Sequence, residues 1–218
     1  PEEIRERNEL VQAGFAYENV HFPADTEALE LARRRLVFEE LFLLACALGR
    51  IKGSHSRAGG RRLEPIKLDE FWGSLPFSPT GAQKRAVEAA VSDMCSGRLM
   101  NRLVQGDVGS GKTLVAAALI WFTWRNGLSS AFMAPTEILA EQHYATLTGI
   151  LGGLGMRIEL LTGSMTAKQK REVKAKLAAG EVDIIIGTHA LFSEDVEYTT
   201  LGLVVTDEQH RFGVNQRS

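Results

Sequence analysis

The sequence predicts an α/β fold in which helices cover both faces of a parallel sheet, preceded by a helical segment. Three observations predict it. From Phe77 onward strand-like apolar runs alternate with helical segments, and repeated units of this kind build parallel sheets. Residues 106–113 fit the phosphate-binding pattern G-x-x-x-x-G-K-T between a strand-like run and a helix. Residues 1–76 lack the alternation, so we predict a helical linker segment over 1–76 and a sheet domain over 77–218.

Composition sets the limits for function. A chain of 218 residues with 44% hydrophobic residues can bury one good core with an appendage, or two small cores. The net charge of −2 gives no general signal for polyanion binding, so any nucleic-acid contact must be local. Cys46 and Cys95 are isolated, which indicates two buried, reduced thiols in a cytosolic protein. The N-terminus is charged, unlike a signal peptide, and no uncharged run is long enough to span a membrane.

The N-terminal segment is predicted to contain two helices, over 1–19 and 25–49. Asp25 or Thr26 caps the second helix, and Gly49 ends it. Residues 36–48 are apolar nearly all round, which indicates burial against another element. Residues 50–62 are basic and contain no acid. They are either a flexible, solvated linker or a contact to nucleic-acid phosphates. The basic residues are Arg50, Lys52, Arg57, Arg61 and Arg62.

The rest of the chain alternates in regular order. A helix over 80–96 is followed by helices over 112–126, 136–150 and 167–179. Strands are expected at 101–105, 130–134, 157–161, 182–186 and 202–206. In such sheets ligands bind at the carboxyl ends of the strands, so chemistry is expected in the loops that follow them.

The phosphate loop is the most specific motif. Its glycines let backbone N–H groups surround phosphate oxygens, and the helix that follows adds the positive end of its dipole. Lys112 is expected to reach the β- and γ-phosphates of a nucleotide, and Thr113 to give a hydroxyl to Mg²⁺. The loop residues are Gly106, Asp107, Val108, Gly109, Ser110, Gly111, Lys112 and Thr113.

A pair of carboxylates follows the last predicted strand. Asp207 is expected to hold Mg²⁺ through water, and Glu208 to polarise the attacking water. An Asp-Glu pair alone is a weak signal. It becomes specific here because it ends an apolar strand and lies downstream of a phosphate loop.

Two further turns carry small and hydroxyl residues at strand ends. Residues 134–140 and 187–190 could bind the phosphates of a nucleic-acid strand through backbone N–H groups and the side chains of Thr136 and Thr188. Taken alone, each is also an ordinary turn between a strand and a helix.

These segments together resemble the RecG family, bacterial DNA helicases of superfamily 2 that remodel stalled replication forks. Residues 33–41 and 75–77 are similar to the family's linker. The resemblance implies a RecA-like motor domain that uses ATP and Mg²⁺. The matching segments are 100–113, 133–143, 161–163, 187–191 and 207–214.

The resemblance also implies roles for single residues. Gln83, in the segment that starts at Phe77, matches the position that recognises adenine, and both residues are expected at the nucleotide. The positions that touch the DNA backbone are matched by Thr136, Gly163 and Thr188. Gln209 and His210 match positions that couple the nucleotide site to the rest of the motor.

The partners that the resemblance implies are branched DNA, such as forks and Holliday junctions, and two domains of the same parent chain. These are a second RecA-like domain, which brings an arginine finger, and an N-terminal wedge. Neither they nor the family's Ser-Ala-Thr motif are present, so we interpret the sequence as an excised piece with little ATPase activity of its own. The parent is expected to be monomeric, cytoplasmic and nucleoid-associated. Two alternatives are a transcription-repair coupling translocase and a non-motor phosphate-loop module, which has no need of the turns at 134–140 and 187–190.

Overall fold

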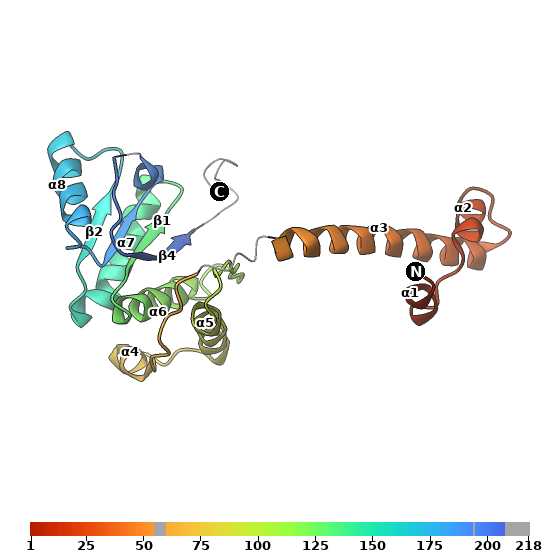
Figure 1. The fold of residues 1–218 in the computed structure, drawn as a ribbon, viewed down its shortest axis with the longest axis horizontal. Helices are drawn as coiled ribbons and strands as arrows, with labels where there is room; N and C mark the ends of the chain where they lie inside the picture. The colour runs from red at the N-terminus through yellow and green to blue at the C-terminus, as the bar shows by residue number, and fades with distance from the viewer. Residues whose placement is uncertain (55–59, 194, 208–218) are drawn as a thin grey trace. The chain divides into compact units, whose positions relative to one another are not determined.

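The computed structural model describes residues 1–54, 60–193 and 195–207. The chain forms two compact units, Pro1–Arg57 and Ala58–Ser218. Figure 1 labels most of the elements of the two units.

Unit 1 is helical, with α1 over Glu2–Arg7, α2 over Ala13–His21 and α3 over Thr26–Ser54. The single helix expected over 1–19 is therefore wrong. The Asn8 side chain donates a hydrogen bond to the Ile4 carbonyl at 2.8 Å, and Glu9 adopts a φ of 54°. The Asn8 side chain occupies a carbonyl that a backbone N–H of a continuing helix would use, and the positive φ of Glu9 is incompatible with a right-handed helix. Together they end the helix. At α3, Asp25 is the capping residue, since its Oδ1 accepts from the Ala28 N–H at 2.7 Å.

The long helix α3 departs from two predictions. It packs on α2 through its first turns, where Ala28 and Ala32 are buried. Its later half, expected to be buried, exposes several large apolar side chains by more than half of their area; they are Val37, Leu41, Leu43, Leu44 and Leu48. The helix also continues through Gly49 to Ser54. A glycine costs a helix interior about 1 kcal/mol, which disfavours the helix without stopping it.

The thiols also differ from expectation. Cys46, on α3, is exposed, and Cys95 is half-buried. Both are free, as predicted. Burial raises the pKa of the Cys95 thiol above its usual value.

Unit 2 contains a four-stranded sheet in the order β2-β3-β1-β4, with every neighbouring pair parallel. The strands are β1 over Ser129–Met133, β2 over Ile158–Leu161, β3 over Ile184–Gly187 and β4 over Leu201–Thr206. The α-helices of this unit are α4 over Asp69–Ser74, α5 over Gly81–Met94, α6 over Lys112–Arg125, α7 over Glu137–Leu151 and α8 over Ala167–Ala178. Two short 3₁₀ helices, η1 over Gly152–Leu154 and η2 over His189–Phe192, complete it.

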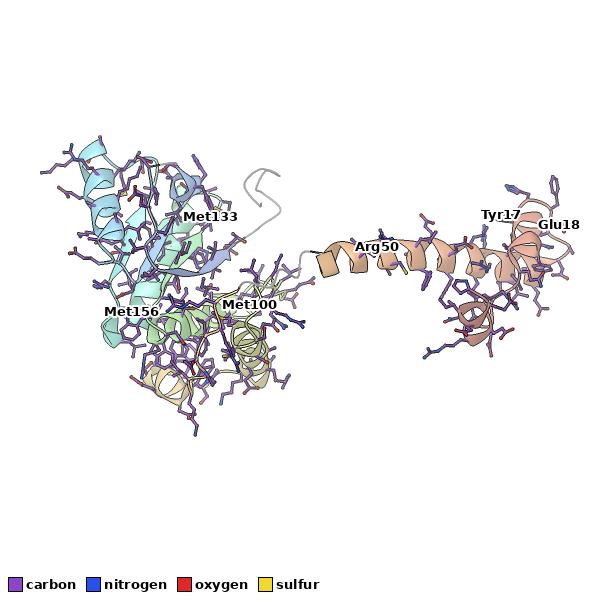
Figure 2. The ribbon with its side chains drawn as sticks, viewed as in Figure 1. Tyr17, Glu18, Arg50, Met100, Met133 and Met156 are labelled. Atoms are coloured by element: carbon purple, nitrogen blue, oxygen red, sulfur yellow. The ribbon has the colours of Figure 1, made fainter. Side chains whose placement is uncertain are left out.

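Helices cover both faces of this sheet, which confirms the predicted fold class. Successive strand residues point to opposite faces. Phe132 and Ile184 belong to the cluster that contains the buried residues of α5, α6 and α7. Met133 and Ile185 belong to a second cluster with Val173 and other residues of α8. Met133 lies within the packed body of the unit (Figure 2).

Residues 60–76 pack within unit 2, whereas the sequence was divided at 76/77. Leu63 and Phe71 are buried in the cluster that also holds Trp121. The Phe71 ring lies 5.9 Å from the Trp121 ring, and Arg125 lies over Trp121 at 5.0 Å. Aromatic side chains bury large areas, so this contact joins the segment before α5 to helix α6.

The strand expected at 101–105 is not formed, and that prediction is wrong. Leu103 in this segment is 78% exposed. Among the described residues, β4 pairs with β1 alone. A groove of about 560 Å³ is lined by residues of β4 and by Arg98, Leu99 and Met100. Strands are stabilised by backbone pairing with a neighbour, and residues 101–105 do not join the four-stranded sheet, so this run stays irregular.

Candidate nucleotide site and strand-end loops

The sheet register brings four predicted site segments to one edge. Gly187 pairs with Met133 on one side and with Leu161 on the other, and Met133 pairs with Thr206. The four strands therefore end level. The residues that follow these ends include Thr136, Gly163, Thr188 and Asp207. The expected juxtaposition of the strand-end loops is thus present in the geometry.

The phosphate loop leads directly into α6. Gly109 has a φ of 83° and Gly111, the residue before the helix, a φ of 78°. Both values lie in the left-handed region that only glycine enters at low cost. A Cβ on Gly106 would lie 2.7 Å from the Ser110 Oγ, so the loop has no room for a side chain there. Helix α6 contacts β1 and β4 and is buried along most of its length.

Lys112 lies across this loop. Its ammonium group donates hydrogen bonds of 2.8 Å to the carbonyls of Gly106 and Asp107. Within the described residues it takes part in no ion pair with a carboxylate. A cation held by carbonyls over a loop of exposed backbone remains attractive to an anion.

Gln83 is tied to the same loop. Its Nε2 donates to the Ser110 carbonyl at 2.9 Å, and its Oε1 accepts from the Thr80 N–H at 2.8 Å. The second bond is half of a capping box at the start of α5. Phe77 is 53% exposed. Gln83 is thus placed against the phosphate loop, with both ends of its amide already bonded.

Asp207 continues β4 beyond its last residue. Its N–H donates to the Met133 carbonyl at 2.9 Å, which keeps the backbone in line with β1. Its Oδ2 lies 2.8 Å from the Nε2 of His143, a residue of α7. Glu208, Gln209 and His210, which the sequence assigned to catalysis and coupling, lie outside the described residues.

The loops expected to meet DNA are connected through Glu137. Thr136 caps α7, because its Oγ1 accepts from the Leu139 N–H at 3.3 Å. The next residue, Glu137, accepts through its Oε1 from the Ser164 N–H at 3.0 Å. Bonds from Ser164 hold the pKa of the Glu137 carboxyl below its usual value. A Cβ on Gly163 would lie 2.7 Å from the same Oε1, so the loop after β2 sits closely on the start of α7.

Thr188 differs from Thr136 and Gly163 in its exposure to solvent. Only 2% of its area is exposed, and its Oγ1 has no hydrogen-bond partner among the described residues. A buried hydroxyl without a partner is costly. In this arrangement the Thr188 side chain faces the protein interior, whereas Thr136 and Gly163 are exposed.

The described residues contain no group of three or more His, Cys, Asp or Glu side chains that could hold a metal ion. Mg²⁺ is commonly bound by one or two carboxylates or hydroxyls together with substrate phosphates and water, without a full protein cage. Thr113 carries a hydroxyl and Asp207 a carboxylate, which are groups of that kind. In the described part of the chain, no helix is both long and apolar enough to cross a membrane.

Two residues of this site were not singled out as functional from the sequence, His143 and Glu137. His143 contacts a residue 64 positions away, so no local pattern identifies it. Glu137 had a signal, since it directly follows the predicted DNA-contacting Thr136.

A glycine-rich phosphate loop at the start of a buried helix, beside a parallel sheet with its strand-end loops along one edge, defines a P-loop nucleotide-binding domain. The family of DEAD/DEAH box helicases matches residues 80–218. This is more than half of the chain, and the chain belongs to that family.

Within the family, the chain is similar to RecG over its whole length. It is 46% identical to the ATP-dependent DNA helicase RecG of Thermotoga maritima over 219 residues, covering 100% of this chain and 28% of that protein. It is 44% identical to RecG of Bacillus subtilis, covering 100% of this chain and 32% of that protein. These matches confirm the resemblance that the motifs indicated. The chain spans about a third or less of the relatives it matches.

Solved structures are also similar to this chain. A structure of RecG bound to a three-way DNA junction superimposes with a TM-score of 0.84 at 45% identity, covering 98% of this chain and 30% of that one. The UvsW helicase of bacteriophage T4 matches with a TM-score of 0.54 at 16% identity, covering 73% of this chain and 55% of that one. The second likeness concerns the fold alone.

Proposed function

We propose that this chain is the nucleotide-binding half of an ATP-dependent DNA helicase or translocase that acts on branched DNA. One observation carries the proposal: the strand register aligns Asp207 with the loops of Thr136 and Gly163 along a single edge of the sheet. Such an edge lets nucleotide chemistry and a nucleic-acid strand act on the same rigid element. The similarity to a RecG that was solved on a three-way junction supports branched DNA as the substrate.

The geometry supports a role for each of these residues. Lys112 already lies over the phosphate loop, and we assign it to the β- and γ-phosphates of ATP. Thr113, in the first turn of α6, and Asp207 would hold Mg²⁺, Asp207 through water. When bound, Mg²⁺ would neutralise charge on the phosphates. Glu208 follows directly and would orient the attacking water.

The DNA side of the site uses the other strand ends. Thr136 and Gly163 are exposed, and the bond between Glu137 and Ser164 joins their loops. We assign both loops to the phosphates of one DNA strand. Thr188 would act through its backbone or through a changed side-chain position, because its hydroxyl faces inward.

By itself this chain is expected to hydrolyse ATP poorly. An arginine finger is worth about 10³–10⁵ in rate, and in the proposed whole protein a second RecA-like domain supplies it. Forked DNA should therefore stimulate hydrolysis in the full-length protein and not in residues 1–218.

The test compares two lysines in the full-length protein. Lys112→Ala should abolish DNA-stimulated ATP hydrolysis and leave the far-UV circular dichroism unchanged. Lys168→Ala is the matched control, because it removes the same charge from an exposed position on α8. Unaltered hydrolysis in Lys112→Ala, or hydrolysis in the wild type that no DNA raises, would overturn the proposal.

A further inference from the structure

The imidazole of His143 is held between three elements of unit 2. It projects from α7, and its Nε2 lies 2.8 Å from the Asp207 Oδ2 at the end of β4. Its ring centroid lies 4.5 Å from that of Phe132, a buried residue of β1. The His143 side chain is 14% exposed and the Asp207 side chain 31%. A ring fixed on one face by an aromatic side chain and at one edge by a carboxylate has little freedom to turn.

Carboxylate oxygens accept hydrogen bonds, so we assign the hydrogen of this bond to the His143 Nε2, which donates it to the Asp207 Oδ2. The bond occupies Oδ2, and the backbone N–H of Asp207 is fixed on the Met133 carbonyl. β1 therefore fixes the backbone of Asp207, and α7 contacts its side chain.

We propose that His143 is a positioning residue for Asp207: its Nε2–H fixes the rotamer of the carboxylate that follows β4. This inference rests on the proposed function, in which Asp207 acts on Mg²⁺ and ATP. Partners that orient a metal-binding carboxylate are typically worth about 10- to 100-fold in metal affinity or activity when removed. His143 touches neither nucleotide nor water in this role, and its effect passes through Asp207.

Three substitutions of His143 separate the loss of its hydrogen bond from the loss of its ring packing. Glutamine places its amide nitrogen close to where a histidine places Nε2, whereas the shorter asparagine places its nitrogen nearer to Nδ1. His143→Gln can therefore restore the bond to Asp207, and His143→Asn cannot. His143→Ala removes the bond and the packing on Phe132 together. Thr148→Ala, at an exposed position on the same helix, is the control.

The experiment uses the full-length protein with forked DNA. We expect His143→Ala and His143→Asn to lower kcat about 10- to 100-fold, with KM for ATP changed less than about threefold. His143→Gln should stay within about threefold of the wild type, and Thr148→Ala should match it. A second readout needs no turnover: the Mg²⁺ concentration at half-maximal binding of a fluorescent ATP analogue should rise in the alanine and asparagine variants only.

Two results would overturn the inference. Either all three His143 variants keep wild-type kcat and Mg²⁺ dependence, or glutamine proves as deficient as asparagine, which would assign the effect to ring packing. Melting temperatures of the glutamine and asparagine variants should agree, because both lose the same ring. A wild type without DNA-stimulated hydrolysis would refute the proposed function instead, and the Mg²⁺-dependent binding series would still decide the role of His143.

Discussion

The bond between Arg157 and Asp183 allows a stability prediction with a worked magnitude. The Asp183 Oδ2 accepts from the backbone N–H of Arg157 at 2.7 Å and from its Nε at 3.1 Å, and the Oδ1 accepts from Nη2 at 2.7 Å. The Asp183 side chain is 11% exposed and the Arg157 side chain 53%. These contacts fix the start of β3 to the residue before β2.

Asp183→Ala should lower the free energy of unfolding by about 2–3 kcal/mol. Breaking a fully buried charged pair costs about 3–5 kcal/mol, but the exposed half of Arg157 can turn to water and reduces that cost. Arg157→Ala should cost about 1–3 kcal/mol, because the buried Asp183 carboxylate loses its charged partner and keeps only the bond from the backbone N–H of residue 157. In the double variant the two losses should not add, since both remove the same side-chain contact.

Urea unfolding followed by tryptophan fluorescence is the assay. All three tryptophans, Trp72, Trp121 and Trp124, belong to unit 2, so the signal reports on the unit that contains the pair. With a slope of about 2–3 kcal/mol per molar urea, Asp183→Ala should move the midpoint by about 1 M. Lys176→Ala, which breaks an ion pair with Glu159 in which the lysine is half-exposed, should leave the midpoint nearly unchanged. A shift below about 0.2 M for Asp183→Ala would refute the reasoning.

Three further predictions follow from other contacts. Gly187→Ala should lower the free energy of unfolding, measured in urea, by at least about 2 kcal/mol, because its Cβ would lie 2.1 Å from a carbonyl oxygen of β2. Gly149→Ala on α7 is the control: a Cβ there meets nothing within 4 Å, so this change should be neutral or stabilising. Burial raises the pKa of Tyr198 to about 12, so the neutral phenol stabilises the fold below pH 10. Between pH 10 and 12 the free energy of unfolding should fall by roughly 1 kcal/mol, a figure discounted for the partial exposure of the ring. Tyr198→Phe should remove that pH dependence, and an unchanged slope would contradict it. Glu137→Ala should loosen the loop at Ser164 and weaken forked-DNA binding by the full-length protein roughly fivefold, with nucleotide affinity in the absence of DNA unaltered; equal loss of both would show a general structural defect.

The features that the sequence predicted well are those set by local chemistry. The phosphate loop was identified because its glycines and Lys112 form a contiguous pattern, and the structure gives Gly109 and Gly111 the positive φ values that such a loop needs. The four longer helices of unit 2, α5 to α8, were predicted to within a few residues, whereas the short helix α4 was not predicted. Threonine caps such as Thr80 and Thr166 fix the starts of such helices locally. Strand ends were located by their apolar runs, which placed Asp207 at the right edge.

The features that it predicted poorly depend on contacts between distant segments. Residues 101–105 have the composition of a strand, but pairing depends on a neighbour that no local pattern specifies. The burial of Thr188 depends on how its turn follows β3. The apolar character of residues 36–48 predicted burial, but burial requires a surface to pack against. Among the described residues of unit 1, the large apolar side chains of that half of α3 are mostly exposed. His143 was missed for the same reason, since its contact with Asp207 depends on how α7 packs on the sheet.

The contacts of the phosphate loop bear on how strongly this chain can bind a nucleotide. The groups expected to contact ATP are already engaged: the Lys112 ammonium bonds two loop carbonyls, and the Gln83 amide bonds Ser110 and Thr80. A phosphate or an adenine must replace these bonds, and each is worth about 0.5–1.5 kcal/mol net, or more for the charged lysine. Replacing four such bonds offsets several kcal/mol of the binding free energy that the new contacts with the nucleotide supply. Nucleotide should therefore bind residues 1–218 weakly. In the proposed full-length protein, a second RecA-like domain that closes on the nucleotide would add further contacts, so we expect tight binding only there.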